Sequence, residues 1–155
     1  MGLAELRGFL QRHRRIALDT SVFIYQVEAN PRYVALAETV FEWLELPNHS
    51  ALTSTITMMD LLLQPYRDLN EERVNRFYAL LSAYPHLDWI APSLEIADIA
   101  ARLRARHGLK SPEAIQAATA IKGGVTALIT NDAVFERVEL FKTAVLDRFY
   151  PNQKS

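Results

Sequence analysis

The sequence predicts an α/β protein: one domain with a three-layer α/β/α architecture around a central parallel sheet of four or five strands. Its 155 residues, 50% of them hydrophobic and 23% charged, fit a single domain with one core. Short apolar runs alternate with amphipathic segments of roughly 10 to 15 residues, as is typical of strands joined by crossover helices. In such sheets ligands bind beyond the carboxyl ends of the strands, near the topological switch point.

Each element is predicted from its local pattern. Strands are expected where short apolar runs stop at turn or polar residues, and helices where apolar residues recur at helical spacing. The expected strands are 16–18, 50–54, 87–92, 125–129 and 141–147. The expected helices are an N-terminal arm within 1–15, one beginning at Asn30-Pro31, one over 55–67, one after Asp68, one over 94–108 and one over 111–124, with another short segment after Asp132.

Several helix boundaries are predicted from capping residues. Asp68 with Glu71 resembles a capping box, and Ser93 is expected to cap the helix over 94–108. Gly108 suits the end of that helix because glycine readily adopts a left-handed conformation. Pro65 is expected to disturb or end the helix over 55–67, since proline lacks a backbone N–H.

Composition excludes some classes of protein. There are no cysteines, so disulfides and thiolate chemistry are excluded. Residues 1–15 lack the continuous apolar core of a signal peptide, and no apolar run approaches the roughly 20 residues of a membrane helix. We expect a cytoplasmic protein without membrane association, in which a helical arm (1–15) precedes the domain (16–150) and a tail (151–155) follows it.

Four acidic residues are candidates for a functional site, and two of them lie at expected strand ends. Asp19 ends the first strand, Asp132 follows strand 125–129, Asp60 lies inside an apolar helix, and Glu113 lies in the first turn of its helix. Each has a local explanation, such as a helix cap, a dipole contact or the solvated position of a helix. If the four converge, pairs of carboxylates about 5 Å apart repel by roughly 3 kcal/mol at an effective dielectric of about 20. Such a cluster stays ionised only with a counter-ion, and its hard oxygen ligands select Mg²⁺ or Mn²⁺.

Four segments resemble, in order and spacing, the signature segments of the PIN-domain ribonucleases, especially those of VapC-like toxins. They read LDTSVFIY, TSTITMMDLLLQPYR, LKSPEAIQAATAI and LITNDAVF. The resemblance covers nearly the whole chain after the N-terminal arm. It implies a PIN-like sheet flanked by helices and a Mg²⁺- or Mn²⁺-dependent endoribonuclease.

The resemblance also implies roles for particular residues. The catalytic and metal-binding acids would be Asp19, Asp60, Glu113 and Asp132, although family members usually carry Glu at the position of Asp60 and Asp at that of Glu113. The polar residues that would orient the metal, its water or the other carboxylates are Thr20, Ser21, Thr130 and Asn131. All four acidic positions remain acidic, which favours retained metal binding.

RNA binding beside an acidic centre requires a basic rim. The candidates are Arg67, Arg102, Arg104, Arg106 and Lys110. The toxin resemblance further implies a type II toxin–antitoxin pair, with a small antitoxin protein over the site, and a homodimer. A stand-alone RNA-processing enzyme fits the same motifs.

Two competing interpretations belong to other functional classes. One is a catalytically weak or inactive PIN-like protein-interaction module, in which the two exchanged acids reflect lost activity and the apolar helices form an interface. The other is a phosphotransfer enzyme of similar shape. It fits less well, because the haloacid dehalogenase type requires an aspartate where Ser21 stands.

Overall fold

The computed structural model describes residues 2–151 and contains a sheet of five parallel strands in the order β3-β2-β1-β4-β5. The strands are β1 (Arg15–Leu18), β2 (Ser50–Ser54), β3 (Leu87–Ile90), β4 (Ala127–Thr130) and β5 (Lys142–Val145). From β1 the chain proceeds outward to β2 and β3, then returns to the other side of β1 to form β4 and β5. The topological switch point therefore lies between β1 and β4, and the predicted fold class is confirmed.

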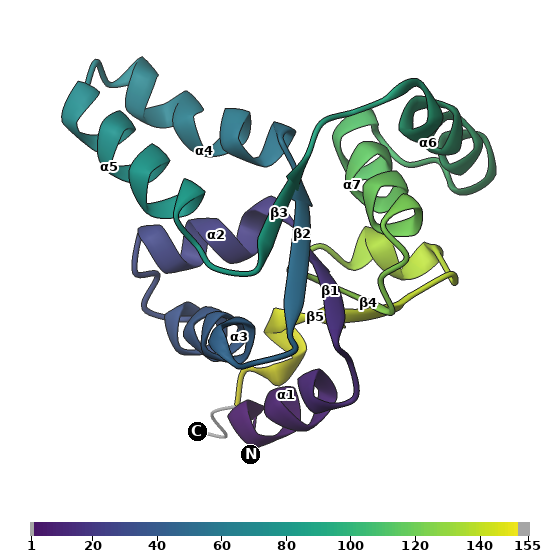
Figure 1. Ribbon diagram of the computed structural model, residues 1–155, viewed down its shortest axis with the longest axis horizontal. Helices are drawn as coiled ribbons and strands as arrows, with labels where there is room; N and C mark the ends of the chain where they lie inside the picture. Colours follow the sequence, from purple (N-terminus) through teal and green to yellow (C-terminus); the bar gives the residue numbers. More distant parts are fainter. Residues whose placement is uncertain (1, 152–155) are drawn as a thin grey trace.

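Helices cover both faces of the sheet (Figure 1). Figure 1 shows α6 and α7 on one side, α1 to α3 on the other, and α4 with α5 projecting as a pair beyond β2 and β3. The α-helices of the described chain are α1 (Gly2–Gln11), α2 (Thr20–Val27), α3 (Val34–Glu45), α4 (Ile56–Arg67), α5 (Glu71–Ser82), α6 (Leu94–His107) and α7 (Ser111–Lys122). Two 3₁₀ helices, η1 (Ala133–Arg137) and η2 (Leu146–Phe149), flank β5.

The strand side chains divide between two hydrophobic clusters. Successive residues of a strand point to opposite faces. Ile16 and Leu18 of β1 accordingly pack in the cluster with α1, α2 and α3, whereas Ala17 packs with α6 and α7. Because both faces are covered, the central strands β1 and β4 are apolar and buried over most of their length, whereas β2, β3 and β5 also contain polar residues.

The N-terminal helix belongs to the first of these clusters. Leu6 and Leu10 of α1 are fully buried, and α1 packs against α3 and η2. No helix within residues 2–151 is long and apolar enough to cross a membrane.

Two predicted helix boundaries are confirmed. The Ser93 hydroxyl accepts a hydrogen bond from the Ile96 N–H at 3.1 Å at the start of α6. Gly108 ends α6 in the left-handed conformation with φ +68°.

The predicted capping box at Asp68 is wrong. Asp68 terminates α4, and α5 is capped by Asn70, whose side-chain oxygen accepts from the Arg73 N–H at 3.0 Å. Pro65 does not end α4, which continues to Arg67.

Two further boundaries differ from the expected ones. α2 begins at Thr20 directly after β1, although no helix was expected between the first strand and Asn30. Asn30 initiates a turn instead, because its side chain accepts from the N–H groups of Arg32 and Tyr33, and α3 begins only at Val34.

Candidate active site

Asp19 and Asp132 lie where the two central strands end. β1 and β4 are adjacent and parallel, with Leu18 opposite Ile129. The Asp19 N–H donates to the Ile129 carbonyl at 3.0 Å, and the Thr130 hydroxyl donates to the Asp19 carboxylate at 2.8 Å. The switch point of the sheet thus brings two of the four predicted acids to the same edge.

Asp19 is a half-buried carboxylate held by several donors. Burial raises its pKa, and the charge of Asp132 raises it further. Hydrogen bonds from the Thr130 hydroxyl, the Thr20 N–H and the Ser21 hydroxyl act in the opposite direction without cancelling the effect of burial. An ionised carboxylate at this position is costly unless a cation is close to it.

Asp60 is linked to the end of β1 by one hydroxyl group. The Thr20 hydroxyl lies 3.2 Å from an Asp60 carboxylate oxygen. Asp60 is exposed, but partial desolvation of its carboxylate raises its pKa, as does the charge of Glu113, whereas the Thr20 hydrogen bond lowers it. The charge of Glu113, at the start of α7, is thus close enough to Asp60 on α4 to act on its carboxyl group.

Glu113 lies in the first turn of α7, as predicted. Its Oε2 atom is buried without a hydrogen-bond partner in the described structure. A buried carboxylate oxygen without a donor is unfavourable in a metal-free protein. This orphaned oxygen, together with the oxygen-only character of the neighbouring acids, fits a hard divalent cation such as Mg²⁺ or Mn²⁺.

The four acids form a linked series, not a closed cage. Asp132 neighbours Asp19, Thr20 connects the end of β1 to Asp60, and Asp60 neighbours Glu113. Within residues 2–151, however, no three Asp, Glu, His or Cys side chains converge tightly enough to hold a metal ion as they stand. Binding would require the carboxylates to move closer together, and their assignment as ligands stays a prediction.

The predicted supporting residues have different roles. Thr20, Ser21 and Thr130 contact the acids directly. The side chain of Asn131 is instead bonded to the Tyr25 hydroxyl at 2.7 Å and to the Asp147 N–H at 2.8 Å, so it contacts α2 and η2. Asn131 therefore connects structural elements and does not contact the acids.

Asp132 also caps the short helix that follows it. Its side chain accepts a hydrogen bond from the Val134 N–H at 3.0 Å. Its role as a helix cap, which the sequence suggested, is therefore compatible with its assignment to the candidate active site.

A buried group of polar residues, which was not predicted from the sequence, lies beneath the acids. It consists of Thr53, Thr57 and Gln116. A polar Gln116 within the alanine-rich face of α7 was the available signal. In the sequence, such residues cannot otherwise be distinguished from ordinary core residues, because their hydrogen-bond partners lie in distant segments of the chain.

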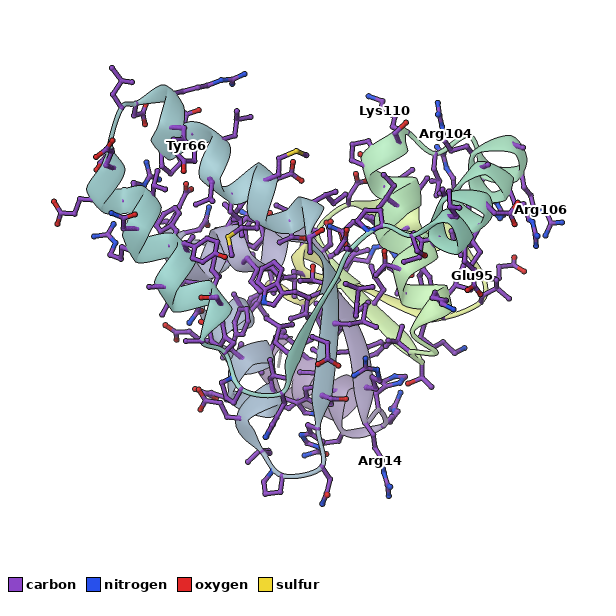
Figure 2. The ribbon with its side chains drawn as sticks, turned by 45° about the horizontal axis from the view of Figure 1, so that its top comes forward. Arg14, Tyr66, Glu95, Arg104, Arg106 and Lys110 are labelled. Atoms are coloured by element: carbon purple, nitrogen blue, oxygen red, sulfur yellow. The ribbon has the colours of Figure 1, made fainter. Side chains whose placement is uncertain are left out.

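The predicted basic residues do not all have free charges. Arg102 pairs with Asp98 at 2.6 Å on α6, and the Arg104 Nε–H donates to the Leu109 carbonyl at 3.2 Å. Figure 2 shows Arg104 and Lys110 projecting from the same end of the α6–α7 pair, whereas Arg106 extends away from α7. Arg67, Arg106 and Lys110 are exposed.

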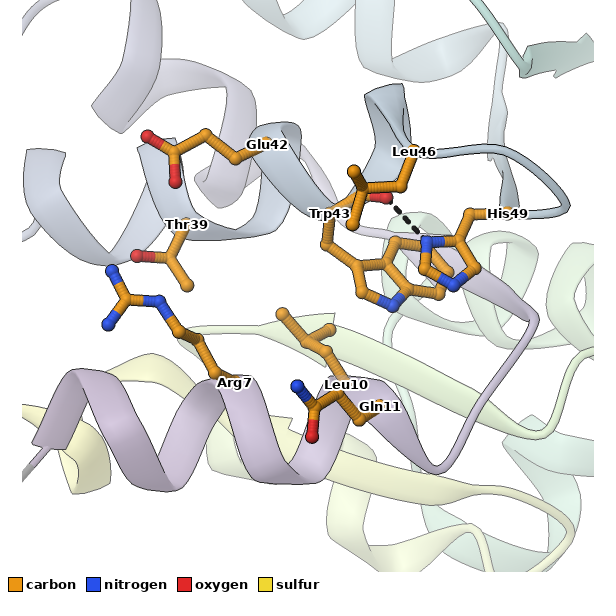
Figure 3. A pocket seen from close by; sticks show the side chains of 8 residues that line it. All are labelled: Arg7, Leu10, Gln11, Thr39, Glu42, Trp43, Leu46 and His49. Carbon is orange, nitrogen blue, oxygen red and sulfur yellow. Dashed lines mark hydrogen bonds between the residues drawn. The ribbon is translucent and has the colours of Figure 1, made fainter.

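A pocket of about 270 Å³ lies between α1 and α3, apart from the acids (Figure 3). Trp43 and His49 stack in its wall, with ring centroids 4.2 Å apart. His49 directly precedes β2, so this pocket is at the amino end of the strand, opposite the edge that carries the acids. It therefore does not belong to the candidate active site.

Comparisons with known proteins agree with the fold. Among curated proteins, none matches the sequence. The structure is similar to a toxin–antitoxin complex from Klebsiella pneumoniae (23% identity over 84% of this chain and 97% of that one, TM-score 0.62) and to VapBC-1 from nontypeable Haemophilus influenzae (21%, 86% and 98%, 0.64). It is also similar to VapC20, a sarcin–ricin loop cleaving toxin from Mycobacterium tuberculosis (16%, 73% and 86%, 0.59). The PIN domain model matches residues 16–140, and the chain therefore belongs to the PIN domain family.

Proposed function

We propose that this chain is a Mg²⁺- or Mn²⁺-dependent endoribonuclease whose active site comprises Asp19, Asp60, Glu113 and Asp132. The observation that carries the proposal is the placement of these acids around the switch point, with the Glu113 Oε2 atom buried and without a partner. A cation is the simplest group that relieves both the orphaned oxygen and the raised pKa of Asp19.

Asp19 and Asp132 would hold the ion chiefly, because both lie at the switch point and Thr130 already fixes the Asp19 carboxylate. Asp60 and Glu113 would orient the attacking water or a second ion from the facing helices. When bound, the ion lowers the pKa of a water molecule and neutralises charge on the scissile phosphate. The resemblance implies products with 5′-phosphate and 3′-hydroxyl ends.

Asp60 on α4 and Glu113 on α7 each carry the other acidic residue type from the one usual in the family. We expect this difference to affect the rate of RNA cleavage and not the presence of a metal site. Compared with the family pattern, Asp60 is one methylene shorter and Glu113 one methylene longer. Displacement of a reacting group by about 1 Å can lower a rate by roughly 10²-fold. We therefore expect metal binding together with a modest rate of cleavage.

Calorimetric titration with Mn²⁺ tests the proposal without knowledge of the RNA. Wild type should bind Mn²⁺ saturably and Asp19→Asn should not, because the variant loses a charged ligand at the switch point. Asp98→Asn is the matched control, since Asp98 is exposed on α6 and pairs only with Arg102 within the described chain. Equal binding in wild type and Asp19→Asn would reject the site.

The similar structures are toxins or toxin–antitoxin complexes, and an antitoxin partner is the corresponding proposal for this chain. The α4–α5 pair offers a suitable surface because it exposes large apolar side chains. These are Met59, Leu63, Tyr66, Leu69, Tyr78 and Leu80. The same surface would serve a homodimer.

The open arrangement of the acids and this apolar surface together favour one alternative, a PIN-like interaction module with weak or no catalysis. A folded wild type without Mn²⁺ binding and without RNA cleavage would support the module over the nuclease.

A further inference from the structure

Two buried polar residues lie directly beneath the acids of α4 and α7. Thr57 precedes Asp60 by three residues, and Gln116 follows Glu113 by three, so each shares a helix face with its acid. Thr57 is fully buried and Gln116 is 4% exposed. The Gln116 Nε2 group donates to the Thr57 hydroxyl at 2.7 Å and joins the two helices.

The direction of the hydrogen bonds follows from the number of protons. Thr53 has one hydroxyl proton, which it donates to the Leu18 carbonyl at 2.7 Å. The contact of 2.7 Å between Thr53 and Thr57 must then use the Thr57 proton. The donors run from Gln116 through Thr57 and Thr53 to Leu18, while the Gln116 Oε1 atom accepts from the Ser54 N–H at 3.4 Å.

This chain of donors reaches the elements that carry three of the acids. It begins on α7, crosses α4 and β2, and ends on the carbonyl that immediately precedes Asp19. Thr20 packs beside this chain of donors, with its hydroxyl oxygen 3.3 Å from the Thr57 oxygen and 3.2 Å from the Asp60 carboxylate. Thr57 already donates its proton to Thr53, so only the Thr20 proton is available for these two contacts. The carboxylate is the stronger acceptor of the single Thr20 proton.

Packing alone does not account for Gln116. Its neighbours on the buried face of α7 are Ala114, Ala117 and Ala118, and an unbranched apolar side chain of similar length would fill the same space. A buried amide is unfavourable unless it is bonded, but when bonded it specifies one arrangement of the surrounding elements. The amide thus fixes α7 relative to α4, which packing against alanine does not.

We infer that Thr57 and Gln116 are positioning residues that set the separation of Asp60 and Glu113, and that they act as one unit. The inference rests on the proposed function, since it concerns how the same acids reach a divalent cation. Outer residues that orient metal ligands typically change metal affinity by 10- to 100-fold.

Isosteric substitutions test the unit. Thr57→Val removes the central hydroxyl, and Gln116→Met removes the amide at similar volume. Thr57→Ser retains the hydroxyl. Thr119→Val is the matched control, because Thr119 is also buried on α7 but donates only to the Ile115 carbonyl of its own helix, at 2.7 Å.

The measurement is the Mn²⁺ dissociation constant by calorimetry, with the melting temperature of each variant recorded. We expect Thr57→Val and Gln116→Met to weaken binding by about 10-fold or more. Thr57→Ser and Thr119→Val should bind as wild type does. The double variant Thr57→Val/Gln116→Met should bind no more weakly than the poorer single variant, because the two residues act together.

Binding by Thr57→Val equal to that of Thr119→Val would overturn the inference while leaving the proposed function intact. Absence of Mn²⁺ binding by the wild type would instead reject the proposed function. In that case crystal structures of metal-free wild type and Thr57→Val decide the matter: displaced Asp60 and Glu113 carboxylates support positioning, and unchanged carboxylates overturn it.

Discussion

The carboxylate of Asp19 is unfavourable for the stability of the metal-free fold but is required by the proposed function. Its pKa is raised mainly by burial, so the unfolded chain ionises this group at a lower pH than the folded protein does. As pH rises above the unfolded pKa of about 3.9, the metal-free fold therefore loses stability, until pH exceeds the folded pKa. A residue retained at such a cost is expected at a functional site.

Asp19→Asn should therefore raise the melting temperature of the metal-free protein at neutral pH. The amide oxygen can still accept from Thr130, and no buried charge remains. The advantage of the variant should shrink as pH falls from 7 to 4, since the wild-type carboxylate becomes protonated. Thermal unfolding of both proteins in chelator measures this difference, and one that does not vary with pH would contradict the assigned cause.

The site was partly accessible from the sequence. Asp19 and Asp132 follow apolar runs and could be placed at strand ends by pattern alone. The contributions of Thr57 and Gln116 could not be predicted, because their hydrogen bonds join segments 59 residues apart in the chain. The buried state of the Glu113 Oε2 atom likewise depends on how α7 packs.

At the scale of elements, some helix boundaries could not be predicted because more than one neighbouring residue was able to cap the helix. Asp68 and Asn70 are both good capping residues, and only the fold shows that Asp68 ends α4 while Asn70 caps the start of α5. α2 was not predicted because only Asp19 separates its short segment from β1, and that residue was interpreted as the end of the strand. The central strands β1 and β4 were simpler to predict, since continuous apolar runs are typical of strands buried on both faces.

Asn70→Ala should lower the free energy of unfolding by about 1 kcal/mol, because the Arg73 N–H loses its acceptor. Asp68→Ala is the control, with an expected loss of less than about 0.5 kcal/mol for an exposed position that caps no helix start. Urea denaturation of both variants provides the comparison. A smaller loss in Asn70→Ala than in Asp68→Ala, whose side chain contacts only Gln64 and Arg73 within the described residues, would contradict the assignment of the cap to Asn70.

At the scale of the whole molecule, α1 contributes to the main core although it precedes the matched PIN region at residue 16. Leu6→Ala should lower the free energy of unfolding by about 2 to 5 kcal/mol, as expected for a fully buried leucine. Leu140→Ala is the matched control, because Leu140 is 72% exposed. Similar losses in both variants would show that α1 is not packed as described.

The surface charges predict how RNA binds. Affinity for a short single-stranded RNA, measured with Asp19→Asn to prevent cleavage, should fall as salt increases, because phosphate contacts release counterions. Adding Lys110→Ala should reduce the slope of log affinity against log salt by about 0.7. Arg14→Ala should leave it unchanged, since Figure 2 places Arg14 at the opposite end of the molecule. Equal effects of Lys110→Ala and Arg14→Ala would remove Lys110 from the RNA surface.

The strand order has a consequence for synthesis of the protein. β4 borders β1 but is translated after β2 and β3, so a chain that ends before β4 lacks the strand that pairs with β1 and also lacks Thr130 and Asp132. No nascent or prematurely terminated product that lacks β4 contains all four acids. If the chain has the proposed ribonuclease activity, that activity can therefore arise only after β4 and Asp132 have been translated.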